Sequence, residues 1–204
     1  MGLSHRIGRM GLVGGMILAG LLLISSVAVA ASPDQVVTQR TDLIAGIMEE
    51  PVGPERTERL TQSINESIDF AHLASRALGR HWRERTEEEQ EEFLTLLQRL
   101  LQANYENRLA DHQLDANYEV EYTAARQRAG QAFVGAKITY KARTEPVLYR
   151  LYRRDGQWHI YDLVIDDISL EETYREGYVP IIEEDGWEEL ISLMRERVEE
   201  LEKE

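Results

Sequence analysis

Residues 147–165 read VLYRLYRRDGQWHIYDLVI, a pattern that predicts a β-hairpin. Apolar side chains alternate with polar ones from Val147 to Leu151, as in a strand with one buried face. Asp155-Gly156 predicts the tight turn of the hairpin, because these residues accommodate the positive φ angles of a two-residue loop. The second arm, Trp158–Ile165, has apolar groups on both faces, so we expect a central strand that is covered on both sides.

Two earlier runs repeat this period of two. One covers residues 118–122 and the other residues 134–140. Together with the hairpin, they predict an antiparallel sheet of four to five strands.

Helical patterns flank these strands in the chain. Helices are expected after Ser32, around Leu60–Ile64, after Asp69, after Thr86, after Ser169 and from Trp187. The helix after Thr86 has the longest apolar stripe, from Phe93 to Leu109. Because runs of helices and strands are segregated, we expect an α+β fold with helices on one face of the sheet.

Residues 1–30 are expected to be a cleaved secretory signal peptide. Two arginines precede an uncharged run that ends in the small-x-small site Ala28-Val29-Ala30. Cleavage after Ala30 leaves residues 31–204 as an exported domain that is not inserted in the membrane. The alternative is an uncleaved anchor, because the uncharged segment Met10–Ala31 is long enough to span a bilayer.

The composition excludes several classes of function. The chain has 204 residues, enough for one globular domain, and its net charge of −14 argues against non-specific binding to nucleic acid or to an anionic membrane. Without residues 1–30, which hold two Arg and no acid, the net charge becomes −16. The chain has no cysteine, which excludes disulfides, a cysteine nucleophile, a cysteine-ligated metal site and a lipid-modified N-terminal cysteine.

The motifs of common catalytic and metal sites are missing from the sequence. Four histidines remain after cleavage: His72, His81, His112 and His159. None is spaced i,i+3 or i,i+4 from another, so no metal site is expected. Asp162, Asp166 and Asp167 are the best acid–base candidates. On a regular strand Asp162 shares an apolar face with Trp158, Ile160 and Val164, where burial would raise its pKa. The alternative is a hydrogen-bonded or edge-solvated carboxylate without chemistry.

Tyrosines concentrate around the expected sheet. Seven of the nine lie in strands, beside them or on the following helix: Tyr118, Tyr122, Tyr140, Tyr149, Tyr161, Tyr174 and Tyr178. A curved sheet lined by Tyr, Val and Ile under a leucine-rich helix either packs shut as a core or leaves an apolar cavity. Periodicity does not separate the two, because both need the same inward faces.

Three blocks of the chain carry a specific combination of residues. The first comprises Ile68-Asp69-Phe70, Leu73, Ala77–Trp82, Gln90, Phe93, Leu100-Leu101 and Tyr105. The second comprises Gly156, Trp158, Tyr161-Asp162, Val164-Ile165, Ile168-Ser169-Leu170 and Tyr174-Arg175, and the third Ile181-Ile182, Gly186 and Leu190-Ile191. These blocks resemble the MlaC family, also called the toluene-tolerance family of periplasmic phospholipid-binding proteins. The chain departs from the family at Asp167, where Gly is expected, and at Glu172-Thr173, which replace an Asn-rich pair.

The resemblance implies a fold, a cargo and partners. The fold would be like that of nuclear transport factor 2, with N-terminal and C-terminal helices packed around an apolar cavity. The protein would be a periplasmic carrier of phospholipid, without cofactor or covalent chemistry. Its partners would be an inner-membrane ABC transporter complex with its periplasmic lipid-binding subunit and an outer-membrane lipoprotein–porin complex, and its role would be to maintain outer-membrane lipid asymmetry.

The expected pocket residues are the inward-facing apolar side chains. They are Leu97, Leu101 and Tyr105 on the long helix, Val120, Val134, Ile138, Tyr149, Leu151, Ile160 and Val164 on the sheet, and Tyr174, Tyr178 and Ile181 on the helix that follows. One alternative is an enzyme of the isomerase or dehydratase type that uses Asp162 with Tyr149 or Tyr161. Another is a periplasmic scaffold protein with a closed core and no ligand.

Overall fold

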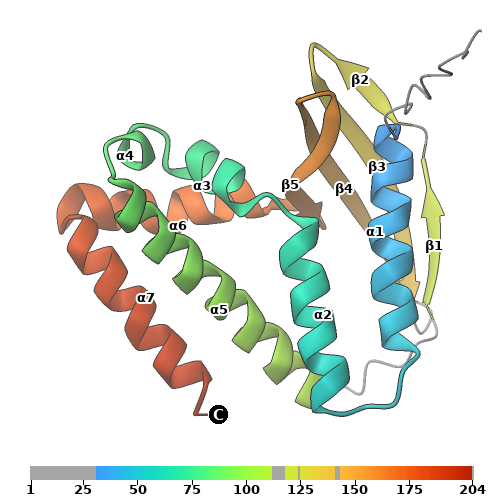
Figure 1. The fold of residues 1–204 in the computed structure, drawn as a ribbon, viewed down its shortest axis with the longest axis horizontal. Helices are drawn as coiled ribbons and strands as arrows, with labels where there is room; N and C mark the ends of the chain where they lie inside the picture. The colour runs from blue at the N-terminus through green and yellow to red at the C-terminus, as the bar shows by residue number, and fades with distance from the viewer. Residues whose placement is uncertain (1–30, 112–117, 124, 141–142, 204) are drawn as a thin grey trace, which may run out of the picture.

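The computed structural model describes residues 31–111, 118–123, 125–140 and 143–203 (Figure 1). The predicted signal peptide and His112 lie outside these residues. The helices are α1 (Pro33–Met48), α2 (Pro54–Ser67), α3 (Phe70–Leu78), α4 (Arg80–Arg83), α5 (Glu87–Asp111), α6 (Leu170–Glu184) and α7 (Trp187–Leu201). The strands are β1 (Tyr118–Tyr122), β2 (Arg126–Arg128), β3 (Gln131–Tyr140), β4 (Arg143–Arg154), β5 (Gln157–Ile165) and β6 (Ile168–Ser169). The predicted α+β fold and its order of helices, strands and helices are confirmed.

Local contacts explain where the helices begin. Thr86 and Glu89 bond reciprocally before α5: the Thr86 N–H donates to Glu89 Oε2 at 2.7 Å, and the Glu89 N–H donates to Thr86 Oγ1 at 3.2 Å. Asp69 caps α3 by accepting the N–H of His72 at 2.9 Å. Such contacts satisfy backbone donors that have no partner within the first turn of a helix.

Antiparallel pairing orders the strands β1-β3-β4-β5-β6, and β2 also pairs with β3. The predicted Asp155-Gly156 turn joins β4 to β5, with φ angles of 52° and 80°. The sheet of the described residues thus has six strands, rather than the four to five that were predicted. The short strands β2 and β6, of three and two residues, escape sequence reasoning because they cannot show a period.

Two of the three apolar clusters in the described residues lie at the sheet and the helices beside it, and the third, Ile47, Met48 and Leu60, joins α1 to α2. Helix α1 packs on one face of the sheet, which we call the inner face, and its fully buried Val37 belongs to one cluster with Val134 and Ile160 there. The larger cluster joins α3, α5, α6 and α7 in a helical lobe beside the sheet (Figure 1). Leu163 of β5 packs against both clusters and therefore marks where the helical lobe meets the inner face.

A β-bulge at Tyr161 changes the predicted faces of β5. Leu151 pairs with Ile160, but the adjacent Arg150 pairs with Asp162, so Tyr161 is an extra residue in the strand. Ile160 therefore lies on the inner face and Asp162 on the opposite face, which we call the outer face. The prediction that these two residues share a face is wrong, because an inserted residue reverses the alternation beyond it.

Strand β5 is covered on both faces, but it is not central. Helix α1 contacts its inner side, and the His72 ring of α3 and the Glu171 N–H of α6 contact its outer side. Strand β6 pairs only with Val164 and Ile165, so most of β5 forms an edge of the sheet, where the Asp69 N–H donates to the Ile160 carbonyl at 2.8 Å. The prediction of a central strand is wrong, because helices on two sides account for the apolar pattern of β5.

Candidate binding site on the inner face of the sheet

The inner face carries three consecutive uncharged rungs, where a rung is a row of residues paired side by side across strands. They are Ala132-Leu151-Ile160, Val134-Tyr149-Leu163 and Tyr122-Ala136-Val147-Ile165. Beyond them, Glu145 and Arg153 at the two ends of β4 bring the first charges. An unpaired charge against alkyl chains is costly, so an uncharged face of this kind suits apolar contacts. Ala132, Val134, Leu151 and Ile160 are at most 3% exposed in the cluster that includes Val37 of α1, whereas Tyr149 and Leu163 are partly buried at its margin.

The structure brings together most of the predicted sheet residues. Six of the seven lie on the inner face: Val120, Val134, Ile138, Tyr149, Leu151 and Ile160. The seventh, Val164, pairs with Leu148 on the outer face because of the bulge. On a regular strand Leu163 and Ile160 would lie on opposite faces of the sheet. The same bulge brings both to the inner face.

The predicted helix residues lie in the helical lobe. Leu97 is 1% exposed in its interior, so it is part of the core. Four others are partly buried against that cluster: Leu101, Tyr174, Tyr178 and Ile181. The side chain of Tyr105 lies outside the described part of the structure.

Tyr174 and Tyr178 form a stacked pair on α6, with ring centroids 5.4 Å apart. Burial raises the pKa of both hydroxyls, that of Tyr178 to about 12. Both side chains therefore remain neutral at physiological pH and add a polar atom to the helical lobe without adding charge.

A small group of hydroxyls lies where α1 meets the inner face, and sequence reasoning missed it. Tyr149 is within hydrogen-bonding reach of the Thr41 side chain on α1, and burial raises the pKa of the Tyr149 hydroxyl. The hydroxyl of Tyr122, close enough to influence Tyr149, is buried and has no partner in the described part of the chain. The available signal was Thr41 itself, one turn after the apolar Val37 on the same side of α1.

Asp162 is held in a network on the outer side of the sheet. Its fully buried carboxylate accepts hydrogen bonds from Ser169 Oγ at 2.8 Å and the Glu171 N–H at 3.0 Å. It also forms an ion pair with Arg150 at 3.0 Å. Tyr149, its proposed acid–base partner, lies on the inner face. Asp162 therefore anchors the start of α6 to β4 and β5. The prediction that it points into an apolar space is wrong, because the bulge turns it to the outer face.

The other proposed partner, Tyr161, packs beneath α3. Its ring contacts His72 edge-on at 5.0 Å and lies under the Arg76 guanidinium at 5.1 Å. Burial raises the pKa of Tyr161. The ring thus serves as packing between α3 and β5.

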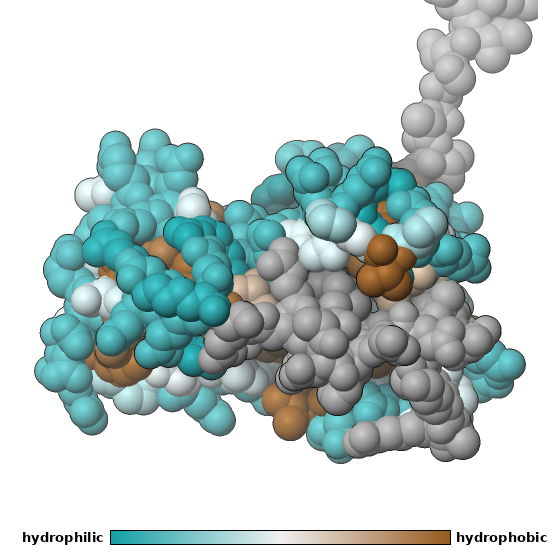
Figure 2. Space-filling model, turned by 90° about the horizontal axis from the view of Figure 1, so that it is seen from below, coloured by the Kyte–Doolittle hydropathy of each residue, from teal (hydrophilic) through white to brown (hydrophobic). Residues whose placement is uncertain are grey.

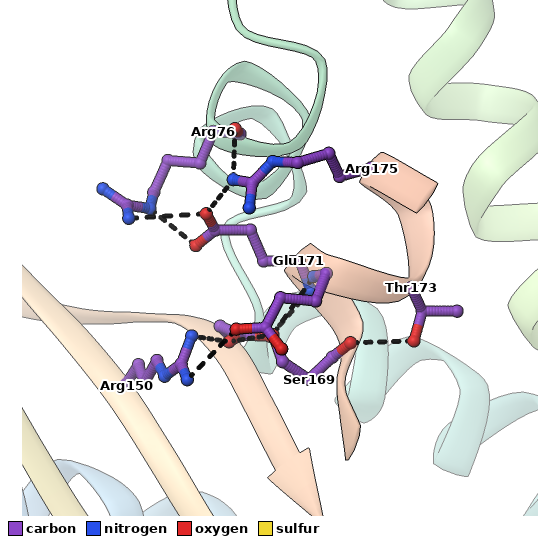
Figure 3. Close-up of polar contacts among 8 residues, drawn as sticks. Arg76, Arg150, Ser169, Glu171, Thr173 and Arg175 are labelled. Atoms are coloured by element: carbon purple, nitrogen blue, oxygen red, sulfur yellow. Dashed lines mark hydrogen bonds and ion pairs between the residues drawn. The ribbon is translucent and has the colours of Figure 1, made fainter. Parts of the chain in front are cut away.

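Glu171 joins α3 to α6 next to this network (Figure 3). The Glu171 carboxylate accepts hydrogen bonds from Arg76 Nε at 2.7 Å and from Arg175 Nη2 at 2.5 Å. The Arg175 guanidinium also donates to the Arg76 carbonyl. Burial on its own would raise the pKa of Glu171, but the hydrogen bonds from the two arginines outweigh it and hold the pKa below its usual value of 4.5. The corner between β5 and α6 is therefore fixed by charge pairs, while the inner face stays apolar.

In the described ranges, no three His, Cys, Asp or Glu side chains are placed to hold a metal ion. No helix there is long and apolar enough to cross a membrane. Seen from below, most of the coloured surface is hydrophilic, with hydrophobic residues in small groups (Figure 2). The large apolar side chains that are exposed are Leu43, Val52, Ile165, Ile168 and Leu193.

Known proteins resemble this chain over most of its length. A family model described as MlaC protein matches residues 38–196. A Haemophilus influenzae protein named intermembrane phospholipid transport system binding protein MlaC is 20% identical over 135 residues, which are 63% of this chain. The match spans 62% of the length of that relative.

A solved structure shares the fold. The phospholipid-binding protein from Ralstonia solanacearum, determined in complex with a phospholipid at 1.53 Å resolution, matches with a TM-score of 0.74 and 24% sequence identity. The match covers 84% of this chain and 99% of that one.

Proposed function

This chain belongs to the MlaC family, and from that premise we propose that it is a periplasmic carrier of phospholipid. The acyl chains lie against the inner face of the sheet and the adjoining side of the helical lobe, and the headgroup stays outside. The protein carries its lipid between an outer-membrane lipoprotein–porin complex and an inner-membrane ABC transporter complex, and so maintains outer-membrane lipid asymmetry. The chain performs no covalent step.

The observation that carries this proposal is the set of three uncharged rungs on the inner face. Leu163 extends that surface to the helical lobe, where Leu101 and the Tyr174–Tyr178 pair add further apolar area. The buried hydroxyl of Tyr122 is a donor without a partner among the described residues, and a glycerol ester carbonyl of a bound lipid would satisfy it.

The energetics of acyl chains explain why such a carrier needs partners. Each buried methylene contributes roughly 0.8 kcal/mol, so two acyl chains are held strongly even after the costs of association. Spontaneous release into water is therefore slow, and delivery requires a partner that offers the chains another apolar path.

The charge of the protein favours docking to proteins over adsorption to lipid. With a net charge of −16 after cleavage at Ala30, the carrier is repelled by anionic bilayers. We expect that it does not bind anionic vesicles, and binding that rises with anionic lipid content would contradict this part of the proposal.

The proposal is tested by native mass spectrometry of the protein purified from the periplasm, followed by solvent extraction and lipid analysis. We expect an adduct with the mass of a phospholipid, recovered as intact lipid. Leu163→Asn, on the inner face, should lower the lipid-bound fraction, whereas Leu193→Asn, on an exposed position of α7, should not. Circular dichroism verifies that both variants fold.

Two results would contradict the proposal. An unliganded mass together with no lipid uptake on incubation would mean that the inner face is part of a closed core, as in a scaffold protein. Equal lipid occupancy in both variants would place any lipid elsewhere.

A further inference from the structure

The outer face of the sheet carries basic side chains in a domain that is otherwise acidic. Residues 118–165 contain eight basic and five acidic side chains, whereas residues 31–117 and 166–204 contain 13 basic and 32 acidic ones. Arg126, Arg128 and Lys137 are exposed, and the register places Arg126 beside Phe133 and Lys137 beside Pro146. The positive charge of the domain is therefore concentrated on the sheet.

These three cations differ from most of the described arginines on the helices. Seven helical arginines pair with glutamates: Arg59, Arg76, Arg80, Arg99, Arg175, Arg195 and Arg197. Arg126, Arg128 and Lys137 have no ion pair with any described residue, although Glu121 lies across from Lys137 in the register. Their charges are thus available to a partner.

A groove of about 670 Å³ lies among these charges. Its lining comprises Thr123, Ala125, Arg126, Phe133, Gly135 and Leu148. Phe133 and Leu148 are half-buried, and Gly135 has so little space above it that an added Cβ would meet Thr123 Oγ1 at 2.5 Å. The groove thus has an apolar floor with Arg126 in its lining, and Arg128 and Lys137 lie two residues further along β2 and β3.

We propose that this groove docks an acidic segment of another protein. Carboxylates of the segment pair with Arg126, Arg128 and Lys137, and an apolar side chain of the segment covers Phe133 and Leu148. The surface is separate from the inner face, so this docking does not depend on the lipid-carrier function.

Shape favours a protein segment over a bilayer. A bilayer surface is flat and does not fill a concave apolar floor. Extended and helical segments bind in grooves of this kind, where side-chain pockets supply specificity and charge supplies the rate of association.

The test uses a fluorescent synthetic peptide that repeats Glu-Glu-Leu and a second peptide that repeats Glu-Glu-Ser, titrated with the mature chain. The leucine peptide should bind at low salt about tenfold more tightly than the serine peptide, because only leucine buries apolar area. Arg126→Glu with Arg128→Glu should weaken binding of the leucine peptide at least about tenfold. The matched control, Arg195→Glu with Arg197→Glu on α7, reverses the same number of charges and should leave binding unchanged.

Each other outcome overturns the proposal. Equal losses in the two double variants would mean that only net charge matters, and equal affinity for the two peptides would exclude a role for the apolar floor. Binding to anionic vesicles that the sheet variant abolishes would assign the surface to a membrane. Self-association in analytical ultracentrifugation that the sheet variant abolishes would assign it to a second copy of this chain. Lipid occupancy by native mass spectrometry, measured in parallel, shows whether the carrier function is intact.

Discussion

The hydroxyl of Tyr122 is buried against apolar residues without a hydrogen-bond partner in the described part of the chain. An unsatisfied donor of this kind costs stability, so its presence is most readily understood if a ligand satisfies it when bound. The neighbouring Tyr149 differs, because its hydroxyl reaches Thr41 on α1. The two tyrosines are therefore a matched pair for measurement.

Tyr122→Phe is expected to raise the free energy of unfolding of the lipid-free protein by about 1 kcal/mol, because it removes an unsatisfied polar group. Tyr149→Phe is expected to lower it by about 1 kcal/mol, because it removes a hydrogen bond. Urea denaturation of the lipid-stripped variants measures both. If the two variants are destabilised equally, the Tyr122 hydroxyl has a partner after all.

Asp167 occupies a position where the family resemblance predicts Gly, and its backbone explains that preference. Asp166 and Asp167 form the turn between β5 and β6 with φ angles of 50° and 64°, in the left-handed region that Gly occupies without strain. Asp167→Gly is therefore expected to raise the free energy of unfolding by about 0.5 kcal/mol. Thermal denaturation measures this change.

The control for this turn is Asp185→Gly, at a residue with φ of −119°. There Gly adds conformational freedom to the unfolded chain and relieves no backbone strain. The free energy of unfolding of this variant should therefore fall by about 0.5 kcal/mol. A loss in both variants would mean that the aspartates of the β5–β6 turn make contacts that offset their backbone strain.

At the scale of elements, the junction between β5 and α6 decides how the helical lobe is attached to the sheet. Asp162 is fully buried with Arg150, Ser169 and the N–H of Glu171, and removing one member of a buried charge pair leaves the other without compensation. We expect Asp162→Asn to lower the free energy of unfolding by about 3 kcal/mol, as measured in urea.

Glu172→Gln is the control, because its carboxylate is 53% exposed and lies 3.8 Å from the same Arg150. Glu172→Gln should lower the free energy of unfolding by less than about 0.5 kcal/mol. Lipid occupancy of folded Asp162→Asn should match that of the unmodified chain, whereas a loss of lipid without a loss of stability would give Asp162 a role in binding.

The second charge pair of this junction makes stability depend on pH. The pKa of Glu171 is below 4.5 in the folded state, because the hydrogen bonds from Arg76 and Arg175 outweigh the effect of burial. Because its pKa is lowered, Glu171 stabilises the fold at pH values above 4.5, its pKa in the unfolded chain. That stability is lost as the pH falls through the pKa of the folded state. Glu171→Gln should therefore flatten the fall in unfolding free energy below about pH 5.

Part of the acid-induced loss should remain in Glu171→Gln, because hydrogen bonds from Tyr152 and His72 outweigh burial and also lower the pKa of Asp69. Glu172→Gln serves again as the control and should retain the full slope. An unchanged slope in Glu171→Gln would show that the arginines do not stabilise its charge in solution.

The elements themselves were largely predictable, and the errors have a common cause. Caps and apolar periods identify α1, α3, α5, α6, α7 and the β4–β5 hairpin, because each of these has enough residues to show its period. The apolar pattern of Trp158–Ile165 does not indicate the bulge at Tyr161, because both faces of this strand carry apolar residues. A regular strand and a bulged one therefore fit the pattern equally well. Asp162 was the available clue, because a regular strand would have buried its charge among apolar residues.

At the scale of the whole molecule, periodicity identified apolar faces but not what covers them. Leu97 and Leu101 belong to one stripe of α5, yet Leu97 is sealed within the helical lobe while Leu101 is only partly buried. The positions of the sheet residues were predicted more accurately, because a period of two divides each strand into only two sides. Which helix side meets the sheet depends on packing between segments far apart in the chain, and the local pattern does not contain it.

Removal of lipid should destabilise the entire fold, because a ligand that binds only the folded state adds stability by mass action. At a lipid concentration of about 100 times Kd, this contribution is about 2.7 kcal/mol. The lipid-stripped protein is therefore expected to unfold at a lower temperature, with recovery when phospholipid is added back. An unchanged unfolding temperature would favour a closed core.

The central claim is that acyl chains lie against the inner face of the sheet. It is tested most directly with a phospholipid that carries a photoreactive diazirine in one acyl chain, loaded into the stripped protein, crosslinked by light and mapped by peptide mass spectrometry. The account predicts adducts on inner-face residues such as Tyr149, Leu163 and Ile165. Adducts confined to the outer face, around Phe133 and Leu148, or to exposed helical residues would contradict it.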